Sequence, residues 1–321
     1  MKICCVGSGY FSVAISKLLT KDEKNEVTIW THDSSWLSKC IKKNKLIVGN
    51  DEYDLDNIKI IDDINLLGEF DVVFILVSSK YIIELFSNIK DIITKKQSAF
   101  IGSKGLISME PYIITSYAKK TLKTNKIGYI AGPNLANDII NNAPCSMCIS
   151  SNNKKAITLG KHLFHNLMID TFNNPKLIEI ASVLKNIYAI GSGMIYQLYP
   201  YSSTLYSYTS KAFIEYQNIL SKYCKYNNRK AITSIIGDFM MTTNEQASRN
   251  FRFGMEMSKS LKDGRDFLKK NTVEGYDNID FMREFMKNQI DEYPIIYAIY
   301  RIIYKNQKTD ILLDICQTVD K

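Results

Sequence analysis

Short apolar runs alternate with helical stretches in the first half of the chain. Runs with the length and composition of buried strands lie at 2–7, 26–33, 58–61, 71–77, 98–104, 126–132 and 145–150. Residues 80–95 instead carry an apolar stripe at helical spacing, formed by Ile82, Ile83, Leu85, Phe86, Ile89 and Ile92. Alternation of this kind predicts a parallel β-sheet covered by helices.

The second half of the chain has helical periodicity alone. It lies in residues 176–198, 209–226, 250–264, 278–290 and 294–306. The turn signal Asn-Asn-Pro-Lys at 173–176 separates the two patterns. We therefore predict an α/β domain over 1–178 followed by an all-α domain over 179–321.

Composition limits the class of protein. With 45% hydrophobic, 23% charged and 11% aromatic residues, the chain has the composition of a folded globular protein. Its net charge of +8 comes mainly from lysines scattered among Asn and Ile. That pattern is typical of solvated faces, so we expect no nucleic-acid partner, whereas an anionic small substrate is compatible.

The cysteines and the N-terminus bear on localisation. The seven cysteines have no repeated spacing, which favours reduced thiols in a cytosol. Lys2 before an apolar run resembles a secretory leader, but Gly-Ser-Gly at 7–9 and the α/β pattern that follows argue against cleavage. No apolar segment reaches the length of a membrane span. We expect a cytoplasmic protein without stable membrane insertion.

A glycine-rich loop follows the first predicted strand and opens a helix. Gly7 permits a tight turn, and Gly9 lets the backbone approach a pyrophosphate at the helix N-terminus. The third position of this dinucleotide fingerprint is Ser12 rather than Gly. The pattern favours a dinucleotide cofactor, and a flavodoxin-like turn without one is the alternative.

The end of the second predicted strand reads Ile-Trp-Thr-His-Asp. It has no acid at the usual ribose-reading position, because Asp33 lies slightly beyond it. NAD and NADP therefore both remain open. His32 is either a contact at the adenosine end or an isolated surface histidine.

Two lysines and one polar stretch are candidates for the chemistry. Lys104 follows a strand end, and Lys185 lies in an apolar helix, where it must snorkel or point into a polar cleft. Taken alone, each has the pattern of a surface lysine. The stretch 237–254 has the i,i+4 pair Asp238 and Thr242, then Ser248 as a candidate N-cap before Arg249 and Asn250. An Arg fork at a helix N-terminus matches a phosphate, so we interpret the stretch as contacting the phosphate and alcohol ends of one small substrate.

Two short motifs resemble metal or redox sites. Cys-Ser-Met-Cys at 145–148 lies on a predicted strand without a second pair, and His-Leu-Phe-His at 162–165 has no evident third ligand. We expect no metal ion.

The chain resembles the NAD(P)-dependent glycerol-3-phosphate dehydrogenases, most closely the bacterial type. The resemblance covers nearly the whole chain. Its motifs occur in family order: GSGYFS, IWTHD, SKGL, AGPNLANDIINNAPCSM, LKNIYAIGSGM, GDFMMTTNEQASRNFRFG, VEGY and YPIIYAIYRIIY. It implies an N-terminal Rossmann domain that binds NAD(P), a helical catalytic domain, and catalysis between the two. It also implies a small phosphorylated substrate and a homodimer.

The resemblance assigns roles to individual residues. Lys185 matches the catalytic lysine, Lys104 the lysine beside substrate and nicotinamide, and Asp238 the acid that orients the first lysine. Substrate contacts are assigned to Lys104, Gly132, Asn134, Lys185, Asp238, Ser248, Arg249 and Asn250. Cofactor contacts are assigned to Gly7, Gly9, Tyr10, Phe11, His32, Lys104, Ala136, Arg249 and Glu274.

The implied reaction is reversible reduction of dihydroxyacetone phosphate to sn-glycerol 3-phosphate, which supplies the backbone of phospholipids. Hydride passes from the reduced nicotinamide to the carbonyl carbon. Lys185 is the implied general acid, and in the reverse direction its neutral amine is the base. Lys104 is expected to stabilise the developing charge.

Several positions depart from the family pattern. They are Ser12, Ser78 in place of a proline, Asn134 in place of Ser or Thr, and Asp138 in place of Glu. The segment 202–213 departs most, because it lacks the Gly-Asp-Asn-Ala pattern and carries tyrosine in place of small residues.

Two other functions remain open at the level of sequence. One is a dehydrogenase of the same architecture that acts on another small hydroxy acid, which Arg249 and Asn250 argue against. The other is a non-catalytic dinucleotide-binding regulator, which only Ser12 and the segment 202–213 support. Nucleotide binding without turnover would distinguish the regulator.

Overall fold

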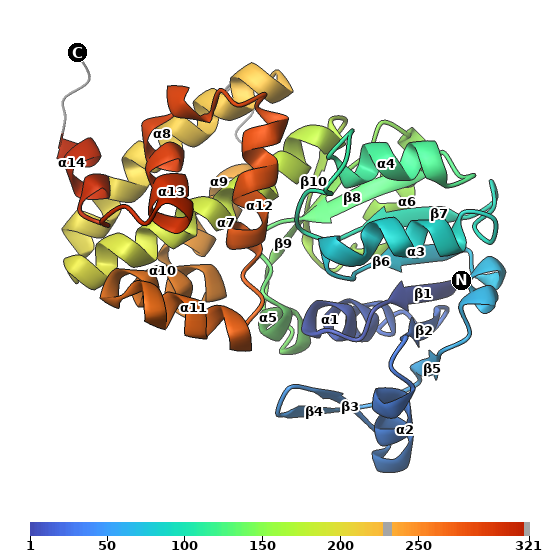
Figure 1. The fold of residues 1–321 in the computed structure, drawn as a ribbon. Helices are drawn as coiled ribbons and strands as arrows, with labels where there is room; N and C mark the ends of the chain where they lie inside the picture. Colours follow the sequence, from blue (N-terminus) through green and yellow to red (C-terminus); the bar gives the residue numbers. More distant parts are fainter. Residues whose placement is uncertain (227–232, 318–321) are drawn as a thin grey trace. The chain divides into compact units, whose positions relative to one another are not determined.

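The computed structural model describes residues 1–226 and 233–317, which form two compact units (Figure 1). The first unit comprises Met1–Ser103 and Met109–Pro175, and the second comprises Lys104–Ser108 and the chain from Lys176 onward. Residues 227–232 and 318–321 of the predicted second domain lie outside the described residues. Helix α7 (Pro175–Leu198) runs through residue 178. The predicted division between the domains at that residue stays a prediction.

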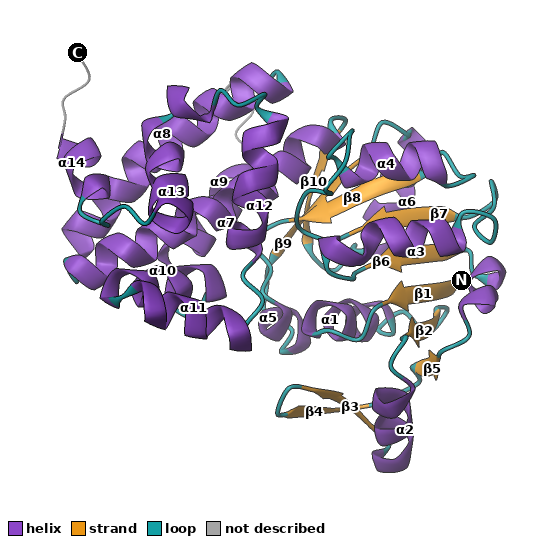
Figure 2. Cartoon of the chain, viewed as in Figure 1, coloured by secondary structure: helices purple, strands orange, loops and turns teal. Residues whose placement is uncertain are grey.

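The first unit is built on an eight-stranded sheet with the order β10-β9-β8-β7-β6-β1-β2-β5. Its strands are β1 (Lys2–Val6), β2 (Glu26–Trp30), β5 (Lys59–Ile61), β6 (Val72–Ile75), β7 (Ser98–Ile101), β8 (Ile127–Ala131), β9 (Ser146–Ser150) and β10 (Met168–Phe172). The predicted α/β class with a parallel sheet followed by helices is confirmed (Figure 2).

One ladder of this sheet corrects the prediction. β8 and β9 pair antiparallel, with Ile130 opposite Ile149, whereas the other ladders of the sheet are parallel. A parallel connection usually needs a full helical crossover, and the chain between these strands holds only the five-residue helix α5 (Ala136–Ile140). The chain therefore turns back on itself there.

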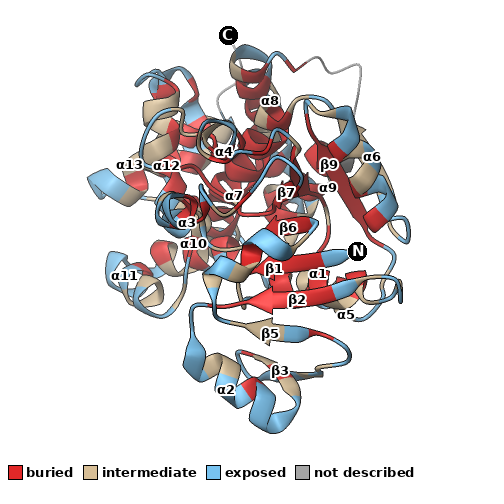
Figure 3. Cartoon of the chain, turned by 90° about the vertical axis from the view of Figure 1, so that its right-hand side faces the viewer, coloured by how far each residue is buried: buried red, intermediate tan, exposed pale blue. Residues whose placement is uncertain are grey.

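Helices cover both faces of the sheet. α1 (Tyr10–Leu19), α5 and α6 (Lys154–Leu163) share one apolar core with β-strand residues such as Phe74 and Phe100. α3 (Ile82–Ile89) and α4 (Ile114–Thr121) lie on the other face, where Phe86 stacks on Tyr117 (Figure 3). The strands between these layers are almost entirely buried, which explains their continuous apolar runs.

A small appendage follows β2. It comprises α2 (Ser34–Lys43) and the antiparallel hairpin of β3 (Lys45–Val48) and β4 (Asp51–Asp54), after which β5 returns to the sheet. The 3₁₀ helices η1 (Ile64–Glu69) and η2 (Ser79–Tyr81) flank β6. The sequence did not predict this hairpin or β10, because β3 and β4 are only four residues each and neither β4 nor β10 is buried.

The second unit is helical. Its elements are α7, α8 (Ser202–Cys224), α9 (Thr233–Asn244), α10 (Arg249–Lys259), α11 (Leu261–Lys270), α12 (Glu274–Phe285), η3 (Ile290–Glu292), α13 (Pro294–Lys305) and α14 (Ile311–Gln317). Within the described residues, no helix is both long enough and apolar enough to cross a membrane.

Helix α7 is the centre of the second unit and is buried along most of its length. Glycines let other helices approach it closely. A Cβ on Gly193 would lie 1.8 Å from the Phe251 carbonyl oxygen, and one on Gly254 would lie 1.9 Å from that of Ile190. This backbone contact fixes the start of α10, and thus Arg249 and Asn250, relative to the helix that carries Lys185.

Candidate active site

The glycine loop of the first unit leaves a helix N-terminus open. Gly7 has φ +124°, which a side chain would strain, and its N–H donates to the Trp30 carbonyl oxygen at 2.9 Å. Gly9 is the N-cap of α1, and a Cβ added there would meet no protein atom within 4 Å. No side chain caps the helix. An exposed glycine before an uncapped helix fits a pyrophosphate group.

The residues after Gly9 tie the loop to its surroundings. The Tyr10 hydroxyl donates to Asp51 Oδ2 at 2.9 Å, so the hairpin β3–β4 is joined to the start of α1. Phe11 is half-buried against the core. Ser12 is fully buried, and its hydroxyl has no hydrogen-bond partner among the described residues. The departure from glycine at this position therefore places an unsatisfied hydroxyl in the core, which is destabilising.

The end of β2 offers no carboxylate to a ribose. Asp33 is the N-cap of α2, and its carboxylate accepts from the Ser35 and Trp36 N–H groups. These bonds, the Trp36 N–H foremost, lower the pKa of Asp33. His32 is exposed beside it. The Asp33 carboxylate is thus occupied by helix capping.

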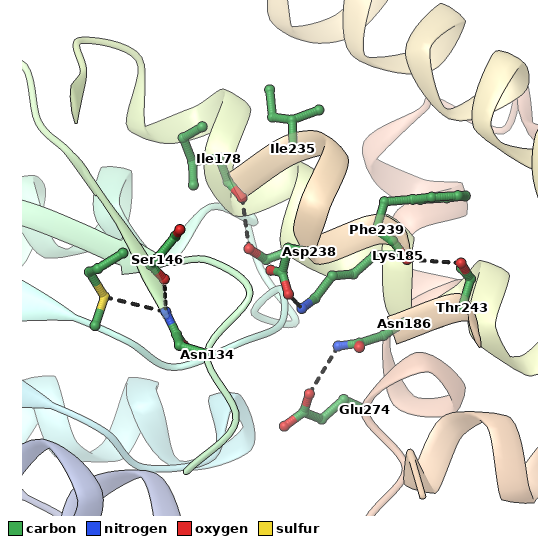
Figure 4. Close-up of polar contacts among 12 residues, drawn as sticks. Asn134, Ser146, Ile178, Lys185, Asn186, Ile235, Asp238, Phe239, Thr243 and Glu274 are labelled. Atoms are coloured by element: carbon green, nitrogen blue, oxygen red, sulfur yellow. Dashed lines mark hydrogen bonds and ion pairs between the residues drawn. The ribbon is translucent and has the colours of Figure 1, made fainter. Parts of the chain in front are cut away.

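The segment after β8 holds the predicted substrate loop. Gly132 has φ +143°, and a Cβ there would lie 2.6 Å from the Ser146 carbonyl oxygen. Asn134 is buried and donates through Nδ2 to the same oxygen at 2.8 Å (Figure 4). Its Oδ1 has no partner among the described residues. Ala136 begins α5 directly after this loop.

The second unit contains a buried ion pair between two neighbouring helices. Lys185 on α7 and Asp238 on α9 point toward one another, and the Lys185 ammonium donates to Asp238 Oδ1 (Figure 4). Lys185 is 2% exposed and Asp238 is fully buried. Asp238 Oδ2 has no hydrogen-bond partner among the described residues. Thr242, one turn further along α9, is also buried.

Burial and three charged neighbours set the protonation of Lys185. Burial lowers the pKa of Lys185 to about 8, because an apolar surrounding disfavours the ammonium. The Asp238 carboxylate opposes this shift by its negative charge and hydrogen bond, and the charge of Glu274 opposes it less, whereas the positive charge of Lys104 adds to it. An amine with a pKa of about 8 can both donate and accept a proton near neutral pH.

The phosphate-binding candidates lie at the start of α10. The helix begins at Arg249 with Ser248 at the N-cap, which confirms the predicted position. The Ser248 side chain makes no hydrogen bond to the helix. Arg249 is exposed. Asn250 is buried, and its Oδ1 accepts from the Gly275 N–H at 2.8 Å.

The first turn of α12 is tied to α7. Glu274 is its first residue, and Glu274 Oε2 accepts from Asn186 Nδ2 at 2.9 Å (Figure 4). A Cβ on Gly275 would lie 2.5 Å from the Asn186 carbonyl oxygen, so only glycine permits this approach. Asn186 had not been singled out in the sequence, although it directly follows Lys185 in the Lys-Asn motif.

The divergent segment 202–213 lies at the start of α8. Its Tyr208 is buried, and the hydroxyl donates to the Tyr188 carbonyl oxygen at 3.0 Å. The ring fits because α7 has Gly191 there, where a Cβ would lie 2.0 Å from the Tyr208 oxygen. Tyr208 of the divergent segment is therefore accommodated by packing against α7, whereas Tyr206 is exposed. Ser78 has φ −60° and ψ 144°, a conformation that proline also adopts.

Each unit gathers its own set of predicted residues. The first unit contains Gly7, Gly9, Tyr10, Phe11, His32, Gly132, Asn134 and Ala136. The second contains Lys104, Lys185, Asp238, Ser248, Arg249, Asn250 and Glu274. Within the described ranges, no group of three or more His, Cys, Asp or Glu residues could hold a metal ion.

Comparison with known proteins identifies the family of the chain. The family model described as the NAD-dependent glycerol-3-phosphate dehydrogenase N-terminus matches residues 2–157, and that of the C-terminus matches residues 175–314. A glycerol-3-phosphate dehydrogenase [NAD(P)+] of Rickettsia prowazekii is 26% identical over 314 residues, covering 94% of this chain and 98% of the relative. One from Leuconostoc mesenteroides is 24% identical, covering 98% of this chain and 97% of the relative.

Solved structures show the same fold. The glycerol-3-phosphate dehydrogenase of Coxiella burnetii superposes with a TM-score of 0.88 at 20% identity and covers 99% of both chains. That of Plasmodium falciparum gives a TM-score of 0.87 at 20% identity, covering 100% of this chain and 96% of that one. The two family models together span nearly the whole sequence, and the chain belongs to the NAD-dependent glycerol-3-phosphate dehydrogenase family.

Proposed function

We propose that the chain catalyses the reversible NAD(P)H-dependent reduction of dihydroxyacetone phosphate to sn-glycerol 3-phosphate, with Lys185 as general acid and base. The observation that carries the proposal is the buried ion pair of Lys185 and Asp238. The positive charge of Lys104 also acts on it, because it lowers the pKa of Lys185. The nicotinamide, when bound, supplies the hydride.

Lys185 moves the proton. When the carbonyl carbon of the substrate gains hydride, negative charge develops on its oxygen, and the Lys185 ammonium donates a proton there. In the oxidative direction the neutral amine removes the proton from the hydroxyl group. A pKa of about 8 makes both forms accessible at moderate pH.

Asp238 and Lys104 tune this step. Asp238 aims the Lys185 side chain through its hydrogen bond and favours the charged form. Lys104 adds positive charge on the same side of the reaction, which stabilises the developing oxyanion. It also opposes protonation of Lys185, so the two neighbours act on the proton in opposite directions.

The start of α10 holds the phosphate. Arg249 is exposed, as a residue that binds an incoming anion must be. Asn250 uses its oxygen for the Gly275 N–H, which leaves its Nδ2 group to donate to a phosphate oxygen. Ser248 and the first N–H groups of the helix complete this set. Binding the phosphate at a distance from the carbonyl positions the reacting carbon.

The remaining proposed contacts are those with the cofactor and those of the substrate loop. Gly7 and Gly9 accommodate the pyrophosphate at the N-terminus of α1, flanked by Tyr10 and Phe11. His32, Lys104, Ala136, Arg249 and Glu274 are the other proposed cofactor contacts. Gly132 and Asn134 are the proposed substrate loop, with the unpartnered Asn134 Oδ1 available to a substrate hydroxyl.

Three wider proposals rest on the sequence alone. The product supplies the glycerol phosphate backbone of phospholipids. The protein acts in the cytoplasm. It assembles as a homodimer, which light scattering coupled to gel filtration would test, with a monomeric mass contradicting it.

The function is tested by mixing purified protein with dihydroxyacetone phosphate and either NADH or NADPH. We expect loss of the reduced-nicotinamide absorbance, with a preference between the two cofactors. Turnover should fall by about 10²–10⁴-fold in Lys185→Met, the range for losing a general acid. Cofactor binding without turnover in the parent protein would contradict the assignment and favour another substrate or a binding role.

A further inference from the structure

Residues 104–108 belong to the second unit although the chain on both sides of them belongs to the first. The segment has no helix or strand of its own, and Gly105 within it has φ +134°. Leu106 and Ile107 are buried. A segment without regular structure depends on neighbouring side chains for its position, so the groups that bind its backbone decide where Lys104 lies.

One buried amide binds this backbone. The Leu106 N–H donates to Asn278 Oδ1 at 2.5 Å, across 172 residues of sequence. Asn278 is 2% exposed and lies on α12, where its Nδ2 donates to the Glu274 carbonyl oxygen at 2.6 Å. Because the oxygen accepts and the nitrogen donates, the orientation of the amide is fixed by both bonds.

The turn that carries Asn278 is itself anchored beside the catalytic helix. Glu274 accepts from Asn186, the residue after Lys185, and the Gly275 N–H donates to Asn250. Hydrogen bonds therefore connect the backbone next to Lys104 with the turn of α7 that carries Lys185. The effect of the Lys104 charge on the pKa of Lys185 places the two lysines within electrostatic range.

We propose that Asn278 is a positioning residue for the reaction, which holds the segment 104–108 so that Lys104 lies beside Lys185. The proposal rests on the proposed function of the two lysines. Asn278 acts through Lys104 and touches neither substrate nor cofactor.

A double-mutant cycle tests this dependence. Asn278→Ala should lower kcat about tenfold, and Lys104→Gln should lower it at least as much. If Asn278 acts through Lys104, adding Asn278→Ala to Lys104→Gln should cost no further activity. The single Asn278→Ala variant should also move the high-pH fall of the reductive rate to higher pH, since the charge that lowers the pKa of Lys185 has moved away.

Asn271 offers a matched control. Its Nδ2 donates to the Phe267 carbonyl oxygen at 3.0 Å, which is the same i−4 bond that Asn278 makes to Glu274. Asn271→Ala should lower stability slightly and leave kcat and the pH profile unchanged. If Asn278→Ala does not fold, Asn278→Asp retains the oxygen that accepts from Leu106 but puts its second oxygen against the Glu274 carbonyl. Its kcat should therefore fall, but by less than the loss of about tenfold expected for Asn278→Ala.

The outcomes separate the two proposals. The positioning role would be overturned if the losses multiply in the double variant. It would also be overturned if the high-pH fall of the reductive rate does not move in Asn278→Ala. Either result would leave the dehydrogenase function intact. Equal losses of kcat in Asn278→Asp and Asn278→Ala would overturn the positioning role too. Absence of turnover in the parent protein would instead overturn the proposed function.

Discussion

Two buried carboxylates in the helical unit have opposite surroundings. Glu215 on α8 is satisfied on both oxygens, which accept from the Tyr188 hydroxyl at 2.9 Å and from the Ile295 and Ile296 N–H groups at 2.8 Å each. Asp238 on α9 has Lys185 on one oxygen and no partner on the other within the described residues. Both are almost inaccessible to solvent.

The difference separates a structural acid from a functional one. The Glu215 carboxylate lies at the N-terminus of α13, where a negative charge is stabilised by free N–H groups and the helix dipole. Burial raises the pKa of Glu215, and its three hydrogen bonds oppose that shift. Asp238 has fewer contacts and an ionisable partner whose pKa is about 8. Incomplete satisfaction beside a titratable lysine is what a proton-transfer site requires.

The largest expected effect comes from removing the lysine. Lys185→Met should lower kcat by about 10³-fold. It also leaves Asp238 buried without a counter-ion, which costs about 3–5 kcal/mol of stability. The double variant Lys185→Met with Asp238→Leu should regain that stability but not the activity. Urea unfolding and initial rates measure both, and a double variant as unstable as the single one would contradict the pairing.

Removing the structural acid should affect stability alone. Glu215→Ala leaves two buried N–H groups and a tyrosine hydroxyl without their acceptor, which we expect to cost about 3 kcal/mol. Glu292, which is 47% exposed in its bridge to Lys222, is the matched control. Its replacement by Ala should cost less than about 1 kcal/mol. A large fall in kcat per folded Glu215→Ala molecule would break the distinction between the two acids.

Changing only the charge of Asp238 sharpens the comparison. Asp238→Asn keeps the size of the side chain but removes the carboxylate that raises the pKa of Lys185. The pKa of Lys185 should then fall below about 8, so the reductive rate should decline at lower pH than in the parent protein. At neutral pH we expect about a tenfold loss, within the range for an impaired general acid. A decline of the reductive rate that moves to higher pH in Asp238→Asn would contradict this prediction.

The smallest expected effect is at the glycine loop. Gly9→Ala meets no protein atom within 4 Å, so stability should change by less than about 0.5 kcal/mol. The added methyl group would instead meet a bound pyrophosphate and weaken cofactor affinity about tenfold. Gly7→Ala, at φ +124°, should lower stability as well. Nucleotide titration and thermal unfolding separate the two, and unchanged affinity in Gly9→Ala would argue against the loop as the binding site.

Much of the fold was predictable because its strands are buried on both faces. Runs such as Val72–Ile75 therefore read as continuous apolar segments. The hairpin strand Asp51–Asp54 and the edge strand Met168–Phe172 were missed, since neither is fully buried. The antiparallel pairing of β8 with β9 depends on a connection whose path no local pattern specifies.

The charged residues of the site were predictable from the resemblance of their motifs to the family. From the residues alone, Lys185 in the apolar helix α7 was either a surface lysine or a lysine in a polar cleft. Asn278 gave no such signal, because an asparagine in a helix is ordinary and its partner Leu106 lies 172 residues away. Contacts of that range depend on the tertiary fold, and a single sequence does not specify them.

The most direct test of the account is the pH dependence of kcat in both directions for the parent protein. With Lys185 as the proton donor, the reductive rate should fall and the oxidative rate should rise through the same pH, near 8. Two limbs that coincide there would support Lys185 as acid and base. Rates that stay flat between about pH 7 and 9 in both directions would contradict the central claim.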